Sequence, residues 1–451
     1  MNVHKFIQWS QGASARERAE GAAALARSYL YGDFGPQDRR EAETILFSLL
    51  DDPSPLVRRA LADSFASSLD APPAVIHGLA NDQADIASIV LSRSPLLTDA
   101  QLIDCAAIAD TAAQTAIALR AELSPAVSAA LAEIASREAL IALAVNEGAQ
   151  LPDFALRRMI ERFGDDGEFR EALLGRAWLP GAARASLATA AARQLAEFAV
   201  ARNWMSRARS ERVAQESRDR ATMIIAAGCS DYSEETGALA AYLRNVGQLT
   251  PGLALRALLC GQSGLFEATL AELTGLSPRR VAGLASEPRA SGFAALYAKA
   301  GLPAPLLPAF RAALAALADQ PDVDEDEEEG ALRLPVIQST LACCLEIADP
   351  ALDRLVALLR RFEADAGREA GRRALERMLA TVRHAPALSA PVAAASAAPV
   401  AAASAAPAAA PQAASVVHDE PVGRVEILDQ PPSETEIVID LVALERELIA
   451  A

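Results

Sequence analysis

Residues that commonly form catalytic or metal-binding sites are scarce in this sequence. Only two lysines stand among its 42 basic residues, and it has five cysteines and four histidines. No histidine lies near another histidine or a cysteine at the spacing of a zinc site or of a Cys–His nucleophile. We therefore expect a protein that is not an enzyme and that holds no metal and no cofactor. The histidines are His4, His77, His384 and His418.

Short ligand-binding motifs are incomplete. No glycine-rich phosphate loop leads into a lysine followed by serine or threonine, and residues 261–264 fall short of the Gly-x-Ser-x-Gly elbow. The acidic run that starts at Asp322 begins like a calcium loop. Its sixth and twelfth positions hold Glu327 and Arg333, where such a loop needs glycine and glutamate. We interpret the run as a solvated linker.

Aromatic residues make up only 4% of the chain, although 52% of it is hydrophobic. The apolar residues are mainly Ala, Leu, Ile and Val. Close-packed helices need small residues of this kind in place of aromatic ones. The composition therefore predicts an all-α protein.

Long apolar runs are missing as well. No stretch approaches the roughly 18 uninterrupted apolar residues of a membrane span, and no apolar run follows Lys5 as in a secretory signal. The net charge of −17 disfavours nonspecific binding to nucleic acid or to an anionic membrane. The cysteines lack the spacing of a disulfide framework, as expected for buried thiols in a reducing cytoplasm. We expect a cytoplasmic protein whose partner is another protein, with no membrane contact.

One stretch, residues 49–62, has the order of a turn between two helices. An apolar helix ends, two aspartates follow, and Pro53 and Pro55 break the backbone before a second apolar segment. Prolines are tolerated in a turn or a first helical turn but not inside a helix. Asp52 can cap the second helix, and Arg58 stands where HEAT repeats place an arginine that reaches an aspartate of the same or a neighbouring turn. The stretch resembles a HEAT-type repeat; the alternative is an ordinary two-helix hairpin.

A spacing of 29 residues follows this stretch. It joins Val57 to Ile86 and Ile86 to Thr115; a step of 25 then reaches Leu140, and 29 more reach Phe169. A fixed period near 30 is typical of stacked helical hairpins. We expect residues 40–180 to form stacked antiparallel helix pairs. The repeat signature is Asp52, Val57, Arg58 and Ile86.

Proline, glycine and composition shifts divide the chain into segments. We expect a HEAT-like helical-repeat solenoid, a second helical domain, a disordered Ala/Pro-rich linker and a short tail. The expected ranges are 1–181 for the repeats, 182–227 for a long connecting helical stretch, 228–318 for the second helical domain, 319–331 for an acidic linker, 332–384 for the C-terminal helices, 385–416 for the Ala/Pro linker and 417–451 for the tail.

The end of the tail has the pattern of a short amphipathic helix. An apolar stripe at helical spacing runs through residues 434–451, while acidic residues occupy other positions. Such a segment is marginal as a free helix and would become helical in a groove, either of a partner or of this chain itself. The alternative is a frayed tail without a partner. The stripe consists of Ile437, Leu441, Leu444 and Leu448.

A DNA-binding regulator is the rival hypothesis. Residues 270–284 resemble a helix-turn-helix, with a glycine turn followed by Arg279 and Arg280, which could meet phosphates. The segment lacks a basic surround, so a structural helical hairpin is favoured. The arginine-rich middle of residues 182–227 is likewise interpreted as a solvated face.

Several segments together resemble the bacterial family catalogued as domain of unknown function 2336. The resemblance covers roughly residues 10–318 and implies a cytoplasmic protein with HEAT-like repeats, without implying a reaction or any catalytic residue. We therefore expect a non-enzymatic protein–protein interaction scaffold or regulatory adaptor. The segments are residues 15–33, 39–43, 49–62, 79–99, 249–258 and 292–303.

Overall fold

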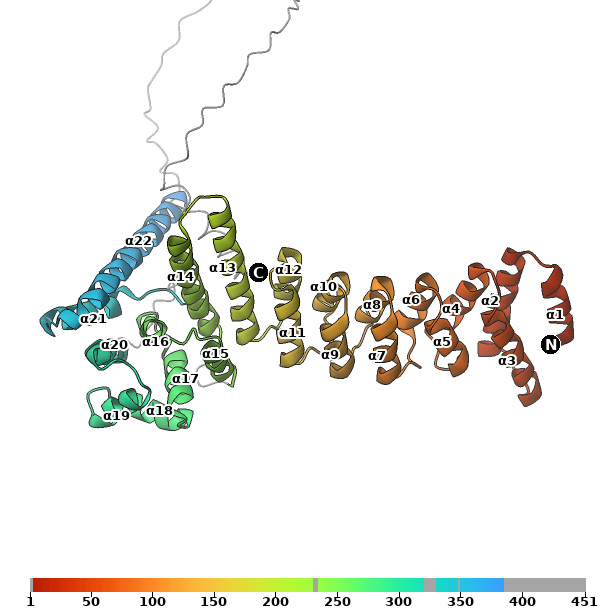
Figure 1. The fold of residues 1–451 in the computed structure, drawn as a ribbon, viewed down its shortest axis with the longest axis horizontal. Helices are drawn as coiled ribbons and strands as arrows, with labels where there is room; N and C mark the ends of the chain where they lie inside the picture. Colours follow the sequence, from red (N-terminus) through yellow and green to blue (C-terminus); the bar gives the residue numbers. More distant parts are fainter. Residues whose placement is uncertain (1–2, 230–233, 320–329, 348, 385–451) are drawn as a thin grey trace, which may run out of the picture. The chain divides into compact units, whose positions relative to one another are not determined.

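The computed structural model describes residues 3–229, 234–319, 330–347 and 349–384, and every regular element in these ranges is a helix (Figure 1). The β-type pairing within them is an isolated bridge between Leu123 and Ala149. The prediction of an all-α protein is confirmed for this part of the chain. Most of the acidic run, the Ala/Pro linker and the tail with Ile437, Leu441, Leu444 and Leu448 lie outside the described residues.

Short helices form the first part of the chain, and turn residues separate them. They are α1 (Val3–Gly12), α2 (Ala15–Tyr31), α3 (Pro36–Leu50), α4 (Pro55–Phe65), α5 (Pro73–Ala80), α6 (Ala84–Arg93), α7 (Asp99–Ile108), α8 (Thr111–Ala118), α9 (Pro125–Ile134), α10 (Arg137–Val145), α11 (Asp153–Phe163) and α12 (Gly167–Leu174).

Local sequence explains where several of these helices begin. Ser14 and Glu17 form a capping box at the start of α2, and Thr98 and Gln101 form another at the start of α7. Each pair satisfies backbone N–H groups that have no partner inside the helix. Pro55 is the first residue of α4, where its missing N–H costs no helical hydrogen bond.

Alternate helices pack in two rows. In one row α2, α4, α6, α8, α10 and α12 each contact the next; in the other, α1, α3 and α5 do so, and further along α7, α9 and α11 (Figure 1). The buried side chains of both rows form one hydrophobic cluster. The helix faces expected from the sequence are buried, with Ala42, Ile45, Leu46 and Leu49 on α3 and Val57, Leu61 and Phe65 on α4. Ala60, also expected on that face, is only half-buried.

The predicted long connecting stretch, residues 182–227, is a pair of helices packed against each other, α13 (Gly181–Ala201) and α14 (Arg207–Ala227). The chain leaves α13 at Asn203, whose φ is 55°. The amide of Asn203 donates to the carbonyl of Val200, and that of Trp204 donates to the carbonyl of Ala199, both at 3.0 Å. These two bonds form a Schellman motif, for which asparagine is a known alternative to glycine. No proline is needed to end the helix.

The remaining helices are longer on average and include two 3₁₀ turns. They are α15 (Glu234–Asn245), α16 (Pro251–Leu259), α17 (Ser263–Thr274), α18 (Pro278–Ala285), α19 (Ser291–Lys299), η1 (Ala304–Leu306), α20 (Leu307–Asp319), α21 (Leu334–Ile347), η2 (Pro350–Leu352) and α22 (Asp353–His384). Three buried aromatic rings, those of Phe266, Tyr297 and Phe310, join α17, α19 and α20.

Contacts divide the chain into two units. The described residues up to Glu363 form one compact unit, and those from Ala364 onward belong to a second. The helices of the predicted second helical domain, residues 228–318, therefore lie in the same unit as the short N-terminal helices.

Candidate binding groove

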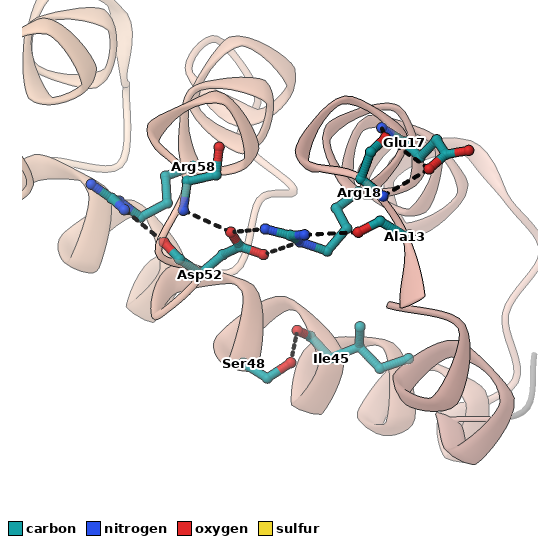
Figure 2. Close-up of polar contacts among 9 residues, drawn as sticks. Ala13, Glu17, Arg18, Ile45, Ser48, Asp52 and Arg58 are labelled. Atoms are coloured by element: carbon teal, nitrogen blue, oxygen red, sulfur yellow. Dashed lines mark hydrogen bonds and ion pairs between the residues drawn. The ribbon is translucent and has the colours of Figure 1, made fainter. Parts of the chain in front are cut away.

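Asp52 lies in the turn between α3 and α4 and joins that turn to α2. Its carboxylate accepts hydrogen bonds from Nε and Nη2 of Arg18, at 2.7 and 2.9 Å, and from the amide of Ser54 at 2.8 Å (Figure 2). The Arg18 guanidinium lowers the pKa of Asp52. The carboxylate thus bonds the residue that precedes α4, whereas α4 itself has no side-chain cap. This differs from the expected capping role because the nearby arginine and the Ser54 amide occupy the carboxylate.

Arg58 joins two successive turns. It donates to Asp82, with Nε at 2.6 Å and Nη2 at 3.1 Å from the two carboxylate oxygens, and its Nη1 donates to the carbonyl of Asp52 at 2.7 Å. Asp82 lies in the turn before α6, so the arginine of one hairpin holds the aspartate of the next. Paired arginine and carboxylate of this geometry form a strong, oriented contact.

Val57 and Ile86 occupy matching positions on α4 and α6, which pack against each other. Both side chains are fully buried. Neither can therefore contact a ligand, and both contribute to the core. Among the four residues of the expected repeat signature, the two apolar ones pack and the two polar ones connect turns.

The contact between arginine and aspartate recurs along one row of helices. Arg137, the first residue of α10, bonds Asp166 before α12 at 2.8 and 2.9 Å. This contact corresponds to that of Arg18 on α2 with Asp52 before α4. It corresponds equally to that of Arg58 on α4 with Asp82 before α6. In each case a carboxylate lies at a helix N-terminus, where the helix dipole favours negative charge.

The opposite ends of the helices carry a complementary contact. Arg120, Arg162 and Arg176 each follow or end a helix and donate to backbone carbonyls at the end of the preceding helix in the same row. Those carbonyls have no partner within their own helix, and positive charge is favoured there. Sequence reasoning missed these arginines, although their spacings of 26 to 33 residues from the carbonyls lie around the 29-residue step.

A groove with a volume of about 390 Å³ lies between α10 and α12. Its apolar lining consists of Ile141 and Val145 of α10, Ala172 of α12, and Gly175 directly after α12. Val145 is 60% exposed although it is a large apolar residue inside a closely packed row of helices. An accessible apolar lining of this kind can receive side chains of a ligand.

Three glutamates give the groove a negative charge. Glu147, Glu168 and Glu171 line it together with Arg176. Glu168 bonds Nη2 of Arg137 at 2.6 Å, whereas Glu147 and Glu171 form no ion pair with any described residue. The Arg176 guanidinium donates to carbonyls, among them that of Asn146 at 2.7 Å, and its positive charge also acts on Glu147. The groove therefore offers two carboxylates to a positively charged ligand.

The predicted helix-turn-helix, residues 270–284, consists of the end of α17, a turn at Gly275 and α18. Gly275 has φ 69°, a conformation that favours glycine. Arg279 and Arg280 are exposed on α18, and neither forms an ion pair with the described part of the chain. α18 has only eight residues, so it presents little surface to a DNA groove.

A half-buried carboxylate lies on α14. Burial raises the pKa of Asp219 to about 6, against the opposite effect of the positive charges of Arg256 and Arg218. Arg256, on α16, is 8% exposed, and its guanidinium lies 5.3 Å from the ring centre of Phe362. This cluster connects α14, α16 and the start of α22 inside one unit.

Metal-binding clusters and membrane-spanning helices are absent from the described ranges. Among residues 3–229, 234–319, 330–347 and 349–384, no three His, Cys, Asp or Glu side chains are grouped to hold a metal ion. Within these ranges no helix has the length and apolar character to cross a membrane. The cysteines are unpaired; Cys105, Cys229, Cys260 and Cys344 are buried, and Cys343 is half-buried.

Comparison with known proteins identifies one family. The family described as "Uncharacterised protein conserved in bacteria (DUF2336)" matches residues 86–338, more than half of the chain. The match includes α10, α12 and the groove between them. No curated protein and no solved structure matches the chain.

Proposed function

We propose that this chain, which belongs to the bacterial family DUF2336, is a cytoplasmic, non-enzymatic scaffold or adaptor that binds a segment of another protein. The groove between α10 and α12 carries the proposal. Its apolar lining would receive apolar side chains, and Glu147 and Glu171 would bind basic ones. The ligand that fits this chemistry is a peptide segment in which leucine-like residues alternate with arginine or lysine.

HEAT-like repeats are the second part of the proposal, and the spacing of side-chain contacts supports it. Arg120 bonds a carbonyl 29 residues earlier, Arg137 bonds a carboxylate 29 residues later, and Arg162 bonds a carbonyl 30 residues earlier. The contacts of Arg18 with Asp52 and of Arg58 with Asp82 span 34 and 24 residues, on either side of this value. Contacts that recur at one spacing are expected when each repeat packs on its neighbour in the same way. Repeat proteins commonly present a continuous surface to a partner.

The acidic groove can be tested with peptides. Full-length protein would be titrated with fluorescent 15-residue peptides in which leucine alternates with arginine, and with peptides in which glutamate replaces the arginine. We expect the basic peptides to bind, and the double change Glu147→Lys with Glu171→Lys to weaken binding about tenfold through lost and reversed charge contacts. The matched control reverses Glu122 and Glu287, which are also exposed but lie outside the groove.

Two outcomes would contradict the proposal. Equal binding of basic and acidic peptides would show that the glutamates do not select the ligand. Unchanged binding after reversal of Glu147 and Glu171 would place the binding surface elsewhere.

DNA binding through residues 270–284 is the alternative function. It is supported by the turn at Gly275 and the exposure of Arg279 and Arg280. The net charge of the chain, −17, opposes it. We therefore favour the protein-binding scaffold.

A further inference from the structure

Two half-exposed aromatic rings lie where α13 ends. Phe198 is 45% exposed and Trp204 is 54% exposed, and their ring centres are 5.3 Å apart in an edge-to-face arrangement. The Schellman motif at Asn203 holds Trp204 over the last turn of α13. An apolar contact between the residue after the left-handed position and one in the last helical turn often accompanies a Schellman motif. Such a contact does not require the two rings to be exposed to solvent. Exposed large aromatic residues are enriched at binding surfaces.

One arginine lies against these rings, and two more are exposed on the helix that follows. The Arg202 guanidinium lies 5.1 Å from the ring centre of Phe198, and Arg207 and Arg212 are exposed in the first turns of α14. The hydroxyl of Ser210 donates to the carbonyl of Ala196 at 2.8 Å, so these turns lie beside the end of α13. We call Phe198, Arg202, Trp204, Arg207 and Arg212 the aromatic–basic patch.

The charge of this region differs from that of the chain as a whole. Residues 197–212 contain four arginines and two glutamates, whereas the whole chain has a net charge of −17. A ligand for the patch must therefore combine apolar groups with negative charge. The groove between α10 and α12 has the opposite preference.

We propose that residues 434–451 of the same chain dock on the aromatic–basic patch. This segment carries five acidic residues and one arginine, beside the apolar stripe of Ile437, Leu441, Leu444 and Leu448. Its charge matches the patch and repels the glutamates of the groove. The stripe would cover the two rings, and the acidic residues would pair with the arginines. The acidic residues are Glu434, Glu436, Asp440, Glu445 and Glu447.

The covalent connection favours this contact over one with a free ligand. Residues 385–433 separate α22 from the segment and are rich in alanine and proline over 385–416. If these residues form the disordered linker expected from the sequence, they would span roughly 40 Å on average, and more where proline stiffens the chain. Tethering on this scale gives effective concentrations in the millimolar range, so a weak contact suffices. The proposal uses a different surface from the groove and does not depend on the proposed function.

The test is a photocrosslink in the full-length chain. The photoreactive residue p-benzoylphenylalanine would replace Leu444, and after irradiation the linked peptides would be identified by mass spectrometry. We expect the links to fall within residues 194–212. Placing the same group at Ala405, in the linker, is the control for random contact. Mixing isotope-labelled with unlabelled protein separates links within one chain from links between two copies.

Charge reversal makes the test specific. Arg207→Glu with Arg212→Glu should lower the link yield about tenfold, and adding Glu445→Arg with Glu447→Arg should restore it. The control pair, Arg27→Glu with Arg157→Glu, changes two exposed arginines elsewhere and should leave the yield unchanged.

Links that map elsewhere, that form only between copies, or that survive reversal of Arg207 and Arg212 would overturn the docking proposal. The proposal also fails if no link forms while the full chain binds phosphatidylglycerol vesicles or single-stranded DNA through these arginines. The patch would then serve another anionic ligand. None of these results bears on the peptide titration of Glu147 and Glu171, so the two proposals fail separately.

Discussion

Arg58 and Asp82, 24 residues apart, form a two-pronged ion pair between the turns of successive helix pairs, with Nε 2.6 Å from one carboxylate oxygen. Both side chains are mostly buried, at 15% and 14% exposure. The same guanidinium holds the carbonyl of Asp52 at 2.7 Å. One side chain thus connects the turn before its own helix with the turn before α6, 24 residues later.

Replacing Arg58 with alanine should lower the free energy of unfolding by about 2–3 kcal/mol. The change removes the guanidinium from the Asp52 carbonyl and from the half-buried Asp82 carboxylate, to which the amide of Gln83 still donates. The adjacent Arg59 is the matched control: it is 55% exposed, and its Nε lies 3.9 Å from Asp63. Arg59→Ala should change stability by less than about 0.5 kcal/mol. Urea unfolding followed by circular dichroism measures both values. Equal effects of the two changes would contradict the role assigned to Arg58.

Sequence reasoning predicted the short helices well and their connections less well. The apolar spacing of α3 and α4 is local information, and the proline at the start of α4 marks its boundary. The partners of Arg120 and Arg176 are not local, because they depend on which helices become neighbours in a row. The end of α13 was missed for a different reason: its signal is one asparagine in a left-handed conformation, which no periodicity reveals.

The groove between α10 and α12 was also beyond sequence reasoning. Ile141 and Ala172 are partly buried residues of helices whose main apolar faces are buried. Whether a residue of such a face is covered depends on the distance between two helices. The tail and the linker lie outside the described residues, so their predicted behaviour stays a prediction.

Val57 and Leu56 offer a direct test of the buried face of α4. Val57 is fully buried and Leu56 is 57% exposed. Val57→Asp should destabilise the protein by about 3–5 kcal/mol, because it buries an unpaired charge, whereas Leu56→Asp should cost less than about 1 kcal/mol. Thermal unfolding of the two variants measures the difference. An unchanged melting temperature for Val57→Asp would contradict the burial of this side chain.

DNA binding should be weak. At physiological ionic strength we expect no salt-sensitive binding of duplex DNA, because a chain with a net charge of −17 repels the phosphate backbone unless its positive charge is tightly clustered. Fluorescence anisotropy with a labelled duplex measures this. Submicromolar binding that is lost on Arg279→Glu with Arg280→Glu would overturn the prediction and favour the alternative function.

Asp52 should make the free energy of unfolding depend on pH in the acid range. The Arg18 guanidinium holds its pKa below the usual value of a carboxyl, 3.8. A lowered pKa in the folded state contributes stability above the unfolded pKa, and this contribution is lost as the pH falls through the folded pKa. Asp52→Asn should therefore cost about 1–3 kcal/mol at pH 7, and progressively less below about pH 4. Urea unfolding at pH 7, 5 and 3 measures the difference. A constant difference at all three values would contradict the ion pair with Arg18.

Asp219 should have the opposite dependence. Burial raises its pKa to about 6, so between about pH 4 and 6 the folded state holds a proton that the unfolded state has lost. The stability contributed by this residue therefore falls as the pH rises through that window and stays low above it. Asp219→Asn removes the titration without a large change in side-chain shape. As the pH rises from 4 to 7, the stability of this variant relative to the wild type should increase by about 2 kcal/mol. Asp52→Asn is the control, since its loss of stability relative to the wild type should stay nearly constant between pH 4 and pH 7 and shrink only below about pH 4. A difference between wild type and Asp219→Asn that does not change with pH would show that Asp219 titrates normally.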